Sequence, residues 1–94
     1  MTEQEFLNLC KEKVKDYTIE HFEKTEEVPP FNVFVVWFCK TLQNAKALLS
    51  TTVSDGMYYE VTFNGDKQEL YLDAYKKFEN RCIPVGARTI SDHK

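Results

Sequence analysis

The sequence predicts a small α+β domain: a two-layer sandwich with an N-terminal helix, an antiparallel meander of three or four strands, and a C-terminal helix. Apolar residues recur at helical spacing near the N-terminus. Runs rich in β-branched and aromatic residues follow, separated by short turn segments. Short connections favour neighbouring antiparallel strands with both helices on one face. At 94 residues the chain holds a single core. We expect one domain over 1–83 and a flexible tail over 84–94.

The first element expected is a helix from Glu3 to Glu23. Thr2 followed by Glu5 has the pattern of a capping box, which satisfies free backbone donors at a helix start. Pro29-Pro30 prevents the helix from continuing. One apolar stripe lies at helical spacing: Phe6, Leu7, Cys10, Val14, Tyr17 and His21.

Three strands are expected next. They cover about residues 32–40, 47–53 and 57–63, with turns at 43–45 and at Asp55-Gly56. The first of them is apolar on both alternating faces, so both faces favour burial.

The C-terminal part allows two interpretations. Asn64-Gly65 is a strong hairpin signal, so 68–72 is expected to return as a fourth strand. Asp73 would then cap a helix ending near Arg81, with Tyr75, Phe78 and Cys82 on its buried side. Alternatively, 67–81 forms one continuous helix.

Strict alternation along the first strand assigns Phe31, Val33, Val35, Trp37 and Cys39 to the core. The other row carries polar residues at both ends and is expected to face away from the helices: Asn32, Phe34, Val36, Phe38 and Lys40. Its expected neighbours are Leu48, Ser50, Thr52, Tyr58, Glu60, Thr62, Glu69 and Tyr71. These residues either pack in the core of the chain or form a face that its own C-terminal helix or tail, a second copy or a foreign partner covers.

No motif for catalysis, a cofactor or a metal stands out. The three cysteines are widely spaced, which is typical of reduced, buried thiols rather than a disulfide framework or zinc site. A nuclease would use five acids near the hairpins as metal ligands: Asp55, Glu60, Asp66, Glu69 and Asp73. However, three of them occupy turn or cap positions, and no lysine follows a strand carboxylate by two residues. No segment resembles a signal peptide or membrane span, so we expect a cytoplasmic protein.

Nucleic-acid binding is the alternative function. The expected element order is that of double-stranded RNA-binding domains, with Lys76-Lys77 and Arg81 near the second helix. However, the net charge is −3, whereas phosphate-binding modules normally have a clustered basic face. Single strands could instead stack on aromatics of the sheet face. The residues available are Phe34, Phe38, Tyr58 and Tyr71, with Lys40, Lys46 and Lys67 near the strand ends.

Several stretches resemble a family of small uncharacterised proteins encoded by temperate phages and prophages of low-GC Gram-positive bacteria. They are Trp37, Lys40–Asn44, Lys46–Leu49, Tyr58–Lys67 and Tyr71–Lys77. The resemblance implies a phage accessory protein made in the bacterial cytoplasm. It implies no catalytic residue, cofactor or established activity.

The sequence therefore predicts a non-enzymatic protein-interaction module without cofactor or metal. Its partner is a second copy, or a host or phage protein. The contact residues expected are Phe34, Val36, Phe38, Lys40, Tyr58, Glu60 and Tyr71.

Overall fold

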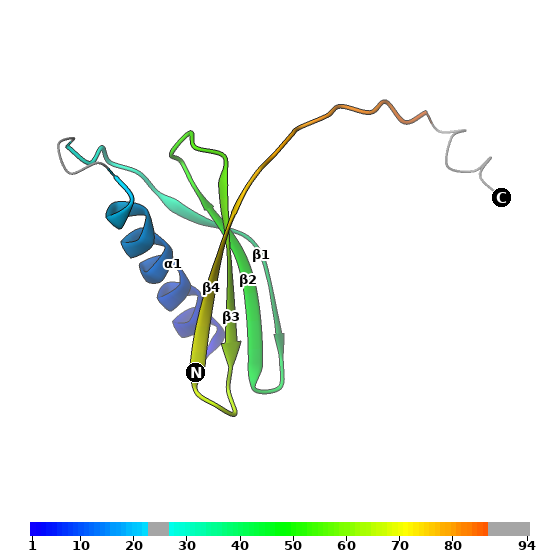
Figure 1. Ribbon diagram of the computed structural model, residues 1–94. Helices are drawn as coiled ribbons and strands as arrows, with labels where there is room; N and C mark the ends of the chain where they lie inside the picture. Colours follow the sequence, from blue (N-terminus) through cyan, green and yellow to red (C-terminus); the bar gives the residue numbers. More distant parts are fainter. Residues whose placement is uncertain (23–26, 87–94) are drawn as a thin grey trace.

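A computed structural model describes residues 1–22 and 27–86 and shows one helix packed on a four-stranded sheet (Figure 1). The elements are α1 (Glu3–Glu20), β1 (Val33–Thr41), β2 (Asn44–Thr51), β3 (Met57–Asn64) and β4 (Glu69–Lys76). The strands form an antiparallel meander in the order β1-β2-β3-β4. The α+β class and the N-terminal helix are thus confirmed.

The predicted C-terminal helix is not formed in the described residues. Instead, β4 continues through Lys76, and its last four residues pair with β3 from Asp73↔Glu60 to Lys76↔Met57. Asp73 is therefore a strand residue and not a helix cap. Residues 77–86 have no regular secondary structure. The element order of double-stranded RNA-binding domains is consequently wrong for this part of the chain.

The capping box at the start of α1 is confirmed. The Thr2 hydroxyl accepts a hydrogen bond from the Glu5 N–H at 3.1 Å, and the Glu5 carboxylate accepts one from the Thr2 N–H at 2.8 Å. The Thr2 backbone bond lowers the pKa of Glu5 because it favours the charged form. The helix ends at Glu20, three residues earlier than predicted, and the expected last residue, Glu23, lies outside the described residues.

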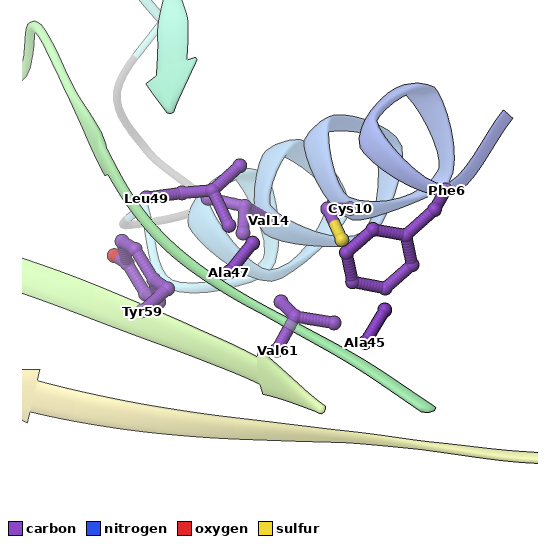
Figure 2. Packing of buried hydrophobic residues seen from close by; sticks show 8 residues of the cluster. All are labelled: Phe6, Cys10, Val14, Ala45, Ala47, Leu49, Tyr59 and Val61. Atoms are coloured by element: carbon purple, nitrogen blue, oxygen red, sulfur yellow. The ribbon is translucent and has the colours of Figure 1, made fainter. Parts of the chain in front are cut away.

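The core lies between α1 and one face of the sheet (Figure 2). Its members come from α1, β2 and β3: Phe6, Cys10, Val14, Ala45, Ala47, Leu49, Tyr59 and Val61. Alanines on β2 leave room for the helix to approach the sheet. Burial raises the pKa of the Cys10 thiol to about 12, so it stays protonated as a small apolar group.

A β-bulge in β1 changes which side chains face the helix. Val35 pairs with Leu49 and Trp37 with the next residue, Leu48, so the pairing skips Val36. Two residues of β1 therefore oppose one residue of β2, and the alternation reverses beyond this point. Of the predicted core row, only Val33 and Val35 pack against the core. Beyond the bulge, Phe38 packs against the core instead of Trp37.

In the part of the chain that the structure describes, no helix combines the length and apolar character needed to cross a membrane.

Candidate interaction face

The side of the sheet opposite α1 is the candidate functional site, which we term the open face. α1 lies against the other side, and no second helix is seen among the described residues (Figure 1). The open face holds sixteen residues that the strand register pairs and the exposed bulge residue Val36. The paired residues are Phe34, Trp37, Cys39, Thr41, Asn44, Lys46, Leu48, Ser50, Tyr58, Glu60, Thr62, Asn64, Glu69, Tyr71, Asp73 and Tyr75.

The register arranges most of these side chains in three rows that cross all four strands. Listed from β1 to β4, the rows are Phe34-Ser50-Tyr58-Tyr75, Trp37-Leu48-Glu60-Asp73, and Cys39-Lys46-Thr62-Tyr71. The outer strands carry four of the five aromatic rings, whereas the middle strands carry mostly smaller or charged groups. Aromatic anchors thus flank a more polar centre.

Large apolar side chains of the open face are half exposed. The exposed fraction is 46% for Phe34 and Val36, 45% for Trp37, 47% for Tyr71 and 52% for Tyr75. Single exposed apolar residues are normal on a protein surface, whereas several large ones on one face are typical of interaction sites. The open face carries five of them around its more polar centre.

Polar contacts fix the centre and one end of the open face. The Lys46 ammonium lies 3.6 Å from a Glu60 carboxylate oxygen. Asp73 stands directly opposite Glu60 on β4, which places two like charges side by side. The Ser50 hydroxyl donates to the Met57 carbonyl at 2.9 Å, which satisfies this buried side chain.

Two further interactions order the tyrosines. The Lys77 ammonium lies 5.9 Å from the ring centroid of Tyr58, within the range of a cation–π contact. A side-chain hydrogen bond to Glu69 raises the pKa of Tyr71, so its hydroxyl remains a neutral donor.

The structure brings five of the seven predicted contact residues together on the open face: Phe34, Val36, Tyr58, Glu60 and Tyr71. Two are on the other side. Phe38 pairs with Ala47, packs against the core, and is wrongly predicted as a member of the open face. Lys40 pairs with Ala45 and lines a pocket of about 250 Å³ beside Met1 and Phe6.

Sequence reasoning missed several members of the open face, including Lys46, which was expected only near a strand end. Trp37 and Cys39 reach it through the bulge, and together with Thr62 they line a hollow of about 240 Å³. Tyr75 and Asp73 reach it because β4 continues where a helix was predicted. The large number of aromatic residues for so small a core could have indicated that Tyr75 is exposed. No signal in the sequence marks the position of the bulge.

The thiols and carboxylates considered as reactive or metal-binding groups are not arranged as such sites in the described residues. Of the three predicted buried thiols, only Cys10 is buried, whereas Cys39 and Cys82 are exposed. Within the described residues, no group of three or more His, Cys, Asp or Glu side chains is placed to hold a metal ion. The Asp55 carboxylate accepts the Met57 N–H at 3.0 Å, as expected for a turn residue.

Comparison with known proteins yields a family and no activity. A family model described as "Family of unknown function (DUF6275)" matches residues 7–85, which include all four strands. No curated protein matches the chain, and no solved structure does.

Proposed function

We propose that this chain, which belongs to the DUF6275 family of unknown function, is a non-enzymatic module that binds a protein through the open face. The observation that supports the proposal is the group of half-exposed aromatic side chains on the side of the sheet opposite the α1-facing core. Burial of apolar area contributes about 25 cal/mol per Å², so such a face favours association.

The arrangement of the open face suits a protein partner. Interface anchors are typically Trp, Tyr and Arg residues in desolvated positions. Here Trp37 and Tyr71 would act as anchors, while the Lys46–Glu60 pair would set specificity at the polar centre.

The charges of the open face favour protein over nucleic acid. Glu60 engages Lys46, and Asp73 opposes Glu60, so the centre carries two acids against one base. Phosphate backbones require the opposite balance. Binding of single-stranded nucleic acid by the open face is therefore the alternative that the experiment must exclude.

The setting is part of the proposal. The resemblance of Tyr58–Lys67 and the other quoted stretches to small phage and prophage proteins supports an accessory protein of the bacterial cytoplasm. Its partner would be a host protein, a phage protein or a second copy.

Trp37 is the single tryptophan and lies on the open face, so its fluorescence reports directly on whether this face is covered. We compare the wild type with the double variant Phe34→Ser/Tyr75→Ser, which removes the two ends of one row and retains Trp37. We expect association in the wild type, measured as mass by light scattering and as protection of Trp37 from acrylamide, and its loss in the variant. Glu12→Ser/Lys15→Ser, on exposed positions of α1, is the control.

The wild type is tested alone over a range of concentrations and as bait in a bacterial lysate. If neither self-association nor variant-sensitive capture is observed, the proposal is wrong. Salt-sensitive binding of a fluorescent oligonucleotide that is lost in Phe34→Ser/Tyr75→Ser would replace the protein partner with nucleic acid.

A further inference from the structure

We infer that the occupant of the open face is a second copy of this chain, which docks through its C-terminal segment 77–86. We term this segment the arm. The inference rests on the proposed function and names the partner that the open face receives.

The arm carries apolar side chains that its own chain leaves in solvent. After β4 ends at Lys76, the chain runs away from the sheet as an extended segment (orange in Figure 1). Phe78 is 98% exposed, Ile83 70% and Val85 59%. From Phe78 to Gly86 every residue is exposed, so these groups and the open face are two unsatisfied apolar surfaces on one molecule.

The base of the arm is fixed at one end of the open face. The Lys77 N–H donates to the Gly56 carbonyl at 2.7 Å, and the Lys77 ammonium lies over the Tyr58 ring. Lys76 pairs with Met57, next to the row that contains Phe34 and Tyr75. The arm therefore leaves the molecule beside the surface that it would cover in a second copy.

The direction and length of the arm favour a second copy over its own face. Ten extended residues reach about 33 Å, whereas four strands span only about 14 Å from first to last. To cover its own face the arm would have to reverse direction directly after Lys77. Its only glycine is the last residue, Gly86, and Pro84 holds the backbone extended. Docking on a second copy requires no reversal.

The charges of the two surfaces are complementary. The open face has three acids, Glu60, Glu69 and Asp73, against Lys46. In the arm, Arg81 pairs with Glu79 at 2.7 Å, so Lys77 supplies the net positive charge. A two-fold pair would use both arms reciprocally, so the same contact forms twice and two open faces are covered.

Native cysteines allow the contact to be tested in the full chain. Cys39 lies on the open face and Cys82 on the arm, and both are exposed, whereas Cys10 is buried. We treat the protein with a short bismaleimide, which links two thiols that lie close together. We expect a covalent dimer whose linked peptides contain Cys39 and Cys82, and loss of this species in Cys39→Ser and in Cys82→Ser. A Cys39–Cys82 link within one chain, or a dimer linked only through Cys82 of both chains, would overturn the inference.

Variants of the arm separate this inference from the proposed function. We expect twice the chain mass for the wild type, and a single chain mass for Phe78→Ser/Ile83→Ser/Val85→Ser with unchanged circular dichroism. The control Glu79→Ser/Asn80→Ser/Arg81→Ser alters the same segment without changing its net charge or its apolar residues, and should remain dimeric.

The possible failures differ. A dimer that survives the apolar arm substitutions but is lost in Phe34→Ser/Tyr75→Ser overturns the inference and leaves the proposed function standing. A monomeric wild type whose open face captures a foreign protein likewise overturns the inference and leaves the proposed function standing. A dimer that survives the changes in the open face overturns the inference, and it contradicts the proposed function as well if no captured protein depends on that face.

Discussion

At the scale of single residues, the position of one extra residue in β1 decides the composition of the open face. The bulge at Val36 exchanges the roles of Trp37 and Phe38 relative to simple alternation. Trp37 becomes an exposed residue of the open face. Phe38 packs against the core and pairs with the fully buried Ala47. Hydrophobicity cannot distinguish these two adjacent aromatics, so only the pairing with β2 assigns them.

Substitution of the two aromatics tests the bulge directly. We expect Phe38→Ser to lower the free energy of unfolding by about 2–3 kcal/mol, because it removes apolar area from the core and leaves a cavity. Trp37→Ser should cost about 1 kcal/mol or less, since half of its side chain is already in solvent. Urea unfolding followed by circular dichroism, at protein concentrations too low for association, measures both. A larger cost for Trp37→Ser would show that the strand alternates without a bulge.

At the scale of elements, local signals determine α1 and the first three strands, whereas a tertiary contact determines β4. The capping box and the apolar stripe of α1 are read directly from the sequence. In contrast, the spacing of Leu70, Ala74 and Phe78 also permits a helix. Pairing with the whole length of β3, down to Met57↔Lys76, outweighs that local preference.

The two hairpin tips at one end of the sheet provide a test of element packing. A Cβ atom on Gly65 would lie only 2.1 Å from the Gln43 carbonyl oxygen, so the tip that follows β3 touches the tip that joins β1 and β2. The Gly65 N–H also donates to the Asn44 side chain at 3.1 Å. We expect Gly65→Ala to destabilise the fold by about 1–3 kcal/mol through overpacking.

Asp66→Ala, at the exposed neighbouring position, is the control and should change the unfolding free energy by less than about 0.5 kcal/mol. Thermal or urea unfolding measures both variants. Equal stability of Gly65→Ala and the wild type would mean that the two tips are not in contact.

At the scale of the whole molecule, composition predicted that one sheet face lacks a cover, and the register defines its members. Phe34, Tyr58 and Tyr71 were predicted from alternation within single strands, and they lie on the open face. Trp37 and Tyr75 required knowledge of the bulge and of β4. In the arm, Phe78 and Cys82 were predicted on the buried side of a helix, and residues 84–86 in a flexible tail. The exposure of Phe78 and Cys82 is evident only once β4 replaces that helix.

If the open face and the arm join two copies, stability must depend on protein concentration, because association stabilises only the folded chains. A hundredfold increase in concentration contributes about 2.7 kcal/mol per dimer, or about 1.4 kcal/mol per chain. For a domain of this size that raises Tm by about 5–10 °C. The variant Phe78→Ser/Ile83→Ser/Val85→Ser should melt at a Tm independent of concentration, while Glu79→Ser/Asn80→Ser/Arg81→Ser should behave as the wild type. Calorimetry over this range measures the effect, and a constant Tm for the wild type would show that its fold is complete in one chain.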